Sequence, residues 1–345
     1  MYKLFRPLLF KLQPETIHRL TVRLLRVLHY VPFARSIMRA VFVHRSPELE
    51  REVLGLKFPN PVGLAAGFDK DAEVYDMLGA LGFGFVEIGT VTPKAQNGNP
   101  KPRCFRLPKD RAIVNRMGFN NRGVQNAVKS LRRRKPGLIV GGNIGKNTLT
   151  PNEQAPSDYL KAFRALYDYV DYFVVNVSCP NVACLTALQS KESTVAILEP
   201  LKEFRQGQSD YRPILLKISP DLTDEQVDQM IEVARESKID GIVATNTTTS
   251  REGLETDPAR VMAIGKGGLS GGPLTRRSRE MVRYICEKTE GKLPVIGVGG
   301  IMSVEDAEAM LEAGASLVQV YSGFIYEGPG FVKRICKRLA GRSKS

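Results

Sequence analysis

Tyr172-Phe-Val-Val-Asn-Val-Ser-Cys-Pro-Asn181 joins four apolar residues to a cluster of polar ones. The apolar run predicts a buried strand, and Pro180 ends it because proline has no N–H to give to a sheet ladder. Two amides, a hydroxyl and a thiol therefore lie in the first turn after a strand, which indicates a ligand site. A turn in which the asparagines and the serine bond their own backbone is the plainer alternative.

The same pattern, an apolar run followed by small polar residues and then a helical segment, recurs along the chain. Eight runs carry it: 62–66, 85–89, 138–144, 172–177, 214–218, 241–245, 294–298 and 317–321. Helical segments are expected between them at 72–81, 157–169, 224–237, 276–289 and 304–313. Eight strand–helix units predict an α/β fold, a (β/α)8 TIM barrel. A doubly wound sheet is the alternative, but no G-x-G-x-x-G follows the first run.

Polar residues collect where the predicted strands end, which is where a barrel of this kind carries its chemistry. Lys217 stands inside an apolar run, where a lysine without a partner would be costly to bury. Gly299-Gly300 and Tyr321-Ser322-Gly323 supply backbone N–H groups at a barrel position that often binds phosphate. We therefore expect a site for a phosphorylated, planar, heteroaromatic cofactor together with a small polar anion.

Histidine and cysteine usage excludes several kinds of chemistry. All three histidines, His18, His29 and His44, precede residue 45, so the predicted barrel has no His base, Ser–His pair or His-ligated metal. The five cysteines are scattered without a C-x-x-C pair, which indicates a reducing compartment and no structural zinc. Two-electron chemistry carried by a flavin fits this composition better than metal-dependent hydrolysis.

Residues 1–45 differ from the rest of the chain in charge. They hold nine lysines and arginines against one acidic residue, Glu15, within a chain whose net charge is +14. Their apolar residues recur at helical spacing and predict two or three short helices. A basic, apolar arm is typical of docking to a membrane surface, whereas a nucleic-acid binder would be basic throughout. Helices that merely pack on the barrel are the alternative. We expect a membrane-docking extension over 1–45 and a catalytic barrel over 46–345, with no transmembrane span or signal peptide.

Nine motifs, in order, resemble the membrane-associated, quinone-dependent class of the dihydroorotate dehydrogenase family. They are residues 63–70, 86–93, 98–107, 115–120, 217–222, 244–247, 267–271, 297–301 and 320–324. The resemblance extends over nearly the whole chain, including the arm. It implies oxidation of (S)-dihydroorotate to orotate in pyrimidine synthesis, with FMN in the barrel mouth and ubiquinone or menaquinone as the electron acceptor. It also implies a peripheral membrane protein on the cytoplasmic face of the cell membrane, with no metal and no nucleic acid bound.

The same resemblance assigns residues to three binding regions. The FMN region comprises Ala66, Gly67, Phe68, Asp69, Lys70, Thr90, Asn143, Asn176, Lys217, Thr245, Gly271, Gly300, Tyr321 and Ser322. The dihydroorotate region comprises Lys70, Asn115, Arg116, Met117, Gly118, Phe119, Asn176, Asn181, Asn246 and Thr247. The quinone region comprises His18, Arg103 and Tyr321.

Cys179 falls at the position of the family's general base, which takes a proton from C5 of dihydroorotate while hydride leaves C6. The quinone-dependent class usually carries serine there, whereas the soluble class carries cysteine. The loop 182–186 also departs from the pattern of the quinone-dependent class, and Cys184 within it has no role that we can derive.

Three other functions are compatible with parts of this pattern. Cys179 would suit a soluble dehydrogenase of the same fold that uses fumarate or NAD, although the arm argues against it. A dihydrouridine synthase acting on tRNA would suit the positive charge, but that charge is concentrated in the arm. A membrane-bound scaffold without catalytic activity would contain no flavin.

Overall fold

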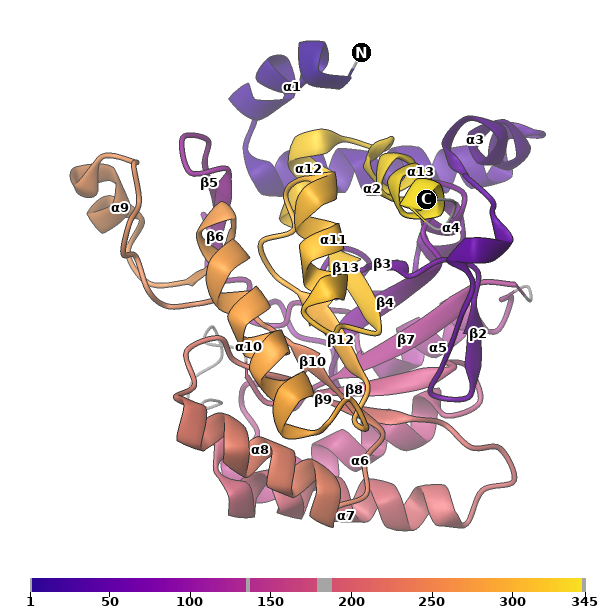
Figure 1. The fold of residues 1–345 in the computed structure, drawn as a ribbon, viewed down its shortest axis with the longest axis vertical. Helices are drawn as coiled ribbons and strands as arrows, with labels where there is room; N and C mark the ends of the chain where they lie inside the picture. Colours follow the sequence, from indigo (N-terminus) through magenta and orange to yellow (C-terminus); the bar gives the residue numbers. More distant parts are fainter. Residues whose placement is uncertain (1, 135–136, 179–187, 343–345) are drawn as a thin grey trace.

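Eight parallel strands close into a barrel in the computed structural model of the chain, which describes residues 2–134, 137–178 and 188–342 (Figure 1). In their order around the barrel they are β3 (Val62–Leu64), β4 (Phe85–Val91), β7 (Ile139–Ile144), β8 (Tyr172–Asn176), β9 (Ile214–Ile218), β10 (Gly241–Ala244), β12 (Val295–Val298) and β13 (Leu317–Val320). Each strand begins within one of the eight predicted runs, and β4 continues two residues beyond its run. The prediction of a (β/α)8 barrel is therefore confirmed, and the doubly wound sheet is excluded.

Helices surround the barrel and bury one face each against it. They are α4 (Tyr75–Gly79), α5 (Val124–Leu131), α6 (Ala155–Leu166), α7 (Lys191–Gln206), α8 (Asp224–Glu236), α10 (Thr275–Lys288), α11 (Val304–Glu312), α12 (Ser322–Glu327) and α13 (Phe331–Arg342). The helix expected over 72–81 is shorter than predicted. Ala72 has a left-handed φ of 55°, and the Asp69 carboxylate accepts the N–H groups of Glu73 and Val74, so the chain turns before α4 can begin.

The barrel interior is built in layers, because side chains of a strand alternate between its two faces. One layer is apolar and contains Phe85, Val174, Leu215, Val243 and Leu317. Two residues further along the same strands, on the same face, come Glu87, Asn176, Lys217, Thr245 and Gln319, all of them buried. An apolar layer thus supports a polar layer near the C-terminal ends of the strands.

A small antiparallel sheet stands beside the C-terminal ends of the barrel strands. It consists of β5 (Cys104–Leu107), β6 (Ala112–Asn115) and β11 (Gly268–Gly271), in the order β11-β6-β5. A two-stranded hairpin, β1 (Arg51–Val53) with β2 (Leu56–Phe58), adds Phe58 to the interior next to Phe85, with ring centroids 5.2 Å apart. The sequence analysis did not foresee either sheet.

The basic arm forms three helices, α1 (Tyr2–Lys11), α2 (Pro14–Tyr30) and α3 (Ala34–Phe42). Figure 1 shows them in indigo at the end of the molecule where α12 and α13 also lie. Leu25 is buried and Met38 and Phe42 pack on the main core, so one side of the arm is docked on the barrel. Among the described residues, no helix is both long and apolar enough to cross a membrane.

Candidate functional site

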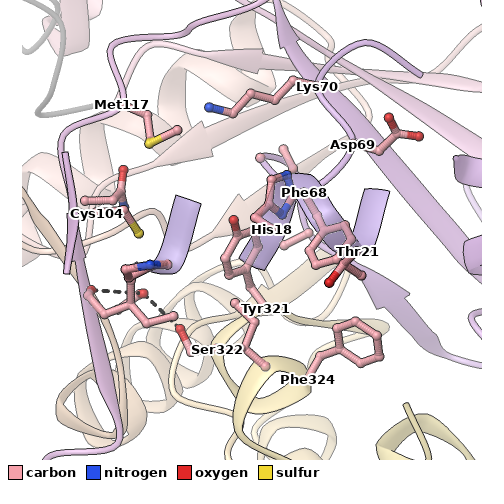
Figure 2. A pocket seen from close by; sticks show the side chains of 18 of the residues that line it. His18, Thr21, Phe68, Asp69, Lys70, Cys104, Met117, Tyr321, Ser322 and Phe324 are labelled. Carbon is pink, nitrogen blue, oxygen red and sulfur yellow. Dashed lines mark hydrogen bonds between the residues drawn. The ribbon is translucent and has the colours of Figure 1, made fainter. Parts of the chain in front are cut away.

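A single cavity of about 950 Å³ connects the polar layer of the barrel with the arm. Figure 2 shows side chains that line it, among them His18, Lys70 and Tyr321. Its walls come from the C-terminal ends of β3, β4, β8, β9, β10, β12 and β13, from the small antiparallel sheet and from α2. The cavity therefore lies at the strand ends, where barrels of this kind carry their sites. The cavity is large enough for more than one ligand.

Most of the predicted site residues line this cavity together. They are Ala66, Gly67, Phe68, Asp69, Lys70, Thr90, Asn115, Met117, Gly118, Phe119, Asn176, Lys217, Thr245, Asn246, Thr247, Gly271, Gly300, Tyr321 and Ser322, with His18 and Arg103 at the arm side. Asn143 and Arg116 are not among the lining residues. Asn143 is fully buried, and Arg116 donates to the carbonyl oxygens of Ile264 and Lys266 instead. The predicted base Cys179, Asn181 and Cys184 lie outside the described residues.

Lys217 supplies a buried positive charge to the cavity. Its side chain is 5% exposed and follows Leu215 on the interior face of β9. Within the described part of the chain, its ammonium group has no hydrogen-bond or ion-pair partner. Burying an unpaired cation is costly, so the surroundings of Lys217 favour a ligand that is anionic or rich in electrons.

Uncharged amides and two hydroxyls surround the same part of the cavity. Asn176 Nδ2 donates to Thr90 Oγ1 over 3.0 Å, and Asn246 Nδ2 donates to Asn176 Oδ1 over 3.2 Å. Asn246 Nδ2 also donates to Ser178 Oγ over 3.0 Å. Such groups can match both the donors and the acceptors of a planar polar ring without any change of protonation.

The ends of β11, β12 and β13 approach one another at a second part of the cavity. Ser322 begins α12, and its Oγ lies 2.9 Å from Ser270 Oγ (Figure 2). Gly300 has a φ of 70°, and a Cβ there would lie 2.2 Å from the backbone nitrogen of Thr275, so only glycine allows this approach. The first N–H groups of a helix have no partners within it, and they favour a phosphate.

Lys70 and Asp69 differ in what they can do. Lys70 Nζ donates to Asn120 Oδ1 over 2.5 Å and places a positive charge at the edge of the cavity (Figure 2). Asp69 instead accepts the N–H groups of Glu73 and Val74 over 2.7 and 2.8 Å. Burial raises the pKa of Asp69 to about 6 in spite of these backbone bonds. We assign Asp69 to the support of the loop.

Aromatic side chains meet at the arm side of the cavity. His18 lies against Phe68 with ring centroids 4.8 Å apart, and Phe68 lies 6.2 Å from the ring of Tyr321 (Figure 2). Burial, together with the charge of Lys70, lowers the pKa of His18 to about 4. Burial also raises the pKa of Tyr321 above its ordinary value. Both side chains are therefore neutral at physiological pH.

Arg103 joins the arm to the barrel. Its Nε and Nη2 donate to the two oxygens of Glu15 over 3.1 and 2.9 Å, and its Nη1 donates to the carbonyl oxygens of Asn97 and Asn99. Most of the donors of this guanidinium group are thus already used within the protein.

Arg106 also lines the cavity, although the sequence did not predict it as a site residue. Its guanidinium carbon lies 4.5 Å from the ring centroid of Phe10, and its Nη1 donates to Leu12 O over 2.8 Å. It shares one face of β5 with Cys104, whose pKa burial raises to about 11. The alternation of side chains along β5 was the available signal, but β5 itself was not predicted.

The described residues contain no group of three or more His, Cys, Asp or Glu side chains placed to hold a metal ion.

Among the known proteins, similar curated relatives carry the name dihydroorotate dehydrogenase (quinone). The relative from Christiangramia forsetii is 55% identical, over 98% of this chain and 98% of its own. The relative from a Synechococcus species is 48% identical, over 97% of this chain and 91% of its own.

Solved structures agree with the sequence matches. The ligand-free dihydroorotate dehydrogenase of Eimeria tenella superposes with a TM-score of 0.87 at 35% identity, over 96% of this chain and 95% of that one. The same enzyme in complex with ferulenol gives a TM-score of 0.85 at 36% identity, over 94% and 90%. The family model described as dihydroorotate dehydrogenase matches residues 48–342. The chain belongs to the dihydroorotate dehydrogenase family.

Proposed function

We propose that the chain oxidises dihydroorotate to orotate in pyrimidine biosynthesis and passes the electrons through FMN to a membrane quinone, either ubiquinone or menaquinone. The relatives named dihydroorotate dehydrogenase (quinone) support the reaction and the kind of acceptor, because the match extends over nearly the whole of both chains. They give no support to the tRNA-acting enzyme or to the scaffold without catalytic activity.

The observation that carries the proposal is the unpaired ammonium group of Lys217 beside a row of amides in one cavity. A flavin that is bound there would accept hydride from dihydroorotate and release the electrons to the quinone. Lys217 would stabilise the negative charge that such a ring gains. Thr90 and Asn176 would hold its polar edge, and Ser322 with Gly300 would hold the phosphate of FMN.

We assign the dihydroorotate region to the part of the cavity that the same amides line. Asn246 and Thr247 line the cavity next to Asn176, and Lys70 stands at its edge. We assign Lys70 to the substrate carboxylate, since the charges are opposite, and the asparagines to the imide edge of the pyrimidine ring. Cys179 remains our proposal for the base that removes the C5 proton.

The quinone region follows from the continuity of the cavity. Phe68 and Tyr321 line it between the polar layer and α2, and His18 closes it from the arm. Because these walls are aromatic and neutral, they suit an uncharged quinone ring. We assign Arg103 to holding this wall in place through Glu15.

The arm has a second face that suits a membrane. Most of the exposed large apolar side chains among the described residues belong to it: Leu4, Phe5, Leu8, Leu12, Leu20, Leu24, Val27, Tyr30, Val31, Phe33, Ile37 and Val41. Exposed apolar groups among arginines and lysines are typical of helices that lie in a membrane interface. We propose that this face docks on the cytoplasmic side of the cell membrane and delivers quinone to the cavity.

The absorbance spectrum of the purified protein tests the proposed function. We expect a flavin spectrum that dihydroorotate bleaches in the absence of oxygen and that quinone restores. A colourless protein, or a flavin that dihydroorotate does not reduce, would refute the proposal. Recovery with fumarate or NAD in place of quinone would support the soluble class, to which Cys179 points.

A further inference from the structure

We propose that Glu87 is a positioning residue for the site that it does not touch. Its carboxylate fixes the direction in which the amide of Asn143 points. Through Asn143 it sets the donors and acceptors that Asn176 and Asn246 present to the cavity. The inference rests on the proposed function, because it concerns the recognition of polar rings in that cavity.

Glu87 is fully buried in the polar layer of the barrel, two residues after Phe85 on β4. Its two oxygens are each bound by an amide. Asn143 Nδ2 donates to Oε1 over 2.7 Å, and Gln319 Nε2 donates to Oε2 over 2.6 Å. Both carboxylate oxygens therefore act as acceptors, and both amides turn their NH₂ groups toward Glu87.

The orientation of Asn143 is passed on toward the cavity. Since Asn143 Nδ2 is held by Glu87, its Oδ1 points the other way and accepts Thr90 Oγ1 over 2.6 Å. Thr90 then accepts from Asn176 Nδ2 over 3.0 Å, which leaves Asn176 Oδ1 to accept from Asn246 Nδ2 over 3.2 Å. Every bond of this relay runs in one direction, and Glu87 stands at its origin.

Reversal of the first amide would disturb the whole relay. If Asn143 turned its NH₂ group toward Thr90, that group would also face the NH₂ group of Asn176, which lies within 3.3 Å of the present Asn143 oxygen. Asn176 would then have to reverse as well, and its NH₂ group would meet that of Asn246. Donors that face donors in a buried site are unsatisfied, which is costly.

The orientation of these amides matters for ligands that are planar rings with an imide edge. Such an edge alternates carbonyl acceptors with an N–H donor, so an amide in the wrong orientation meets it donor to donor. A buried site that is built to bond a polar group discriminates strongly against a mismatch. Thr90, Asn176 and Asn246 line the cavity, whereas Glu87 and Asn143 do not, so Glu87 acts only through the others.

Two substitutions at this position separate amide orientation from charge. Glu87→Met removes both acceptors at similar volume, so the NH₂ group of Asn143 is left without its partner. Glu87→Gln keeps one acceptor for Asn143, and Gln319 can turn its amide to accept from the new NH₂ group, because Gln319 Oε1 has no partner among the described residues. Val86→Ala is the matched control, since Val86 is buried on the same strand but faces the helices.

The readouts are the dissociation constant of orotate, measured by its perturbation of the flavin spectrum, and the dissociation constant of FMN itself. We expect Glu87→Met to weaken orotate binding about tenfold or more, whereas Glu87→Gln and Val86→Ala stay within about threefold of the wild type. Wild-type affinity in Glu87→Met overturns the inference. An equal loss of orotate affinity in Val86→Ala also overturns it, because the effect would then be structural. An equal loss in Glu87→Gln overturns it as well, because the charge of Glu87, and not the orientation of the amides, would then determine the affinity.

A double-mutant cycle covers the case in which Glu87→Met does not fold. Glu87→Gln and Gln319→Met each leave Asn143 an acceptor, but the double variant has no group left to accept from the new NH₂ of residue 87. We expect the loss of orotate affinity in the double variant to exceed the product of the single losses, and simple additivity would overturn the inference. Reduction of the wild-type flavin by dihydroorotate is measured separately, so a failure of the proposed function is distinguishable.

Discussion

Lys217, which we assign to the flavin, should destabilise the protein when no ligand is bound. The side chain is 5% exposed and has no partner among the described residues, so the protein without flavin holds an uncompensated cation in its interior. Replacement of a buried charge by an apolar group of similar size often stabilises a fold. The same replacement removes a charge from the ligand site. Stability and flavin binding should therefore respond in opposite directions at this residue.

We predict that Lys217→Met raises the melting temperature of the flavin-free protein and weakens FMN binding about tenfold or more. Lys146→Met is the matched control, because Lys146 is equally buried but its Nζ donates to Thr150 O over 2.8 Å. That variant should lose stability and keep its flavin affinity. Calorimetry of the flavin-free proteins and flavin titration measure both quantities. A less stable Lys217→Met protein with unchanged FMN affinity would refute this view of the site.

A second prediction at the residue scale concerns Cys179 as the proposed general base. A thiol has a reference pKa of about 8.5, so it loses its proton far more readily than a serine hydroxyl. We expect Cys179→Ser to slow flavin reduction by dihydroorotate by up to about a hundredfold at neutral pH, and to move the rise of the rate to higher pH. Rapid-mixing measurements against pH test this, with Cys184→Ser as the control. An unchanged profile in Cys179→Ser would show that the thiol is not the base.

At the scale of elements, α2 is the helix of the arm whose side chains bind it to the barrel. Glu15 pairs with Arg103, Arg26 with Glu73 at 3.2 Å, and His18 lies against Phe68. Burial raises the pKa of Glu15, but the hydrogen bond and charge of Arg103, with the charges of Lys101 and Arg19, outweigh burial and leave that pKa below its ordinary value. The ion pair therefore contributes stability above the ordinary pKa of a glutamate and loses it below.

We predict that acid loosens α2, and that His18 acts first. Its pKa is about 4 in the folded protein against 6.5 for a free histidine, so the undocked state binds more protons between these values. Docking should weaken as the pH falls from 6.5 toward 4. The chain has no tryptophan, so Phe42→Trp gives a fluorescent probe of the arm. The acid response should be reduced in His18→Gln. An unchanged acid response in His18→Gln would contradict the prediction. Asp69 acts in the opposite direction, because its pKa is raised to about 6 and the folded barrel therefore gains stability as the pH falls.

The elements that the sequence predicted are those with a local signal. Strands buried on both faces give continuous apolar runs, so all eight barrel strands could be found. The small sheet could not, because β11 pairs with β6 from far along the chain and each strand has four residues. Site residues at strand ends followed from the barrel rule, whereas Glu87 and Arg106 depend on which face of a strand they occupy and on three-dimensional neighbours.

At the scale of the whole molecule, most of the exposed large apolar side chains among the described residues lie on the outer side of the arm. We predict that Leu8→Asp, Leu24→Asp and Ile37→Asp each weaken binding to anionic vesicles about tenfold. Each substitution removes one aliphatic side chain that would be buried in the membrane interface when the arm docks. The three side chains are exposed, so thermal stability should not change. Met262→Asp is the control, since Met262 is exposed on α9 (Pro258–Ile264), outside the arm. Vesicle co-sedimentation tests this, and equal binding by all four variants would contradict the docking proposal.

The central claim is that one cavity joins the flavin site in the barrel to a quinone entrance formed by the arm. The most direct measurement compares the full chain with residues 46–345 in two steps, first reduction by dihydroorotate without oxygen and then reoxidation by quinone. We predict that dihydroorotate bleaches the flavin in both proteins, and that quinone restores its colour rapidly only in the full chain. Equally rapid reoxidation of the shortened protein would contradict the account.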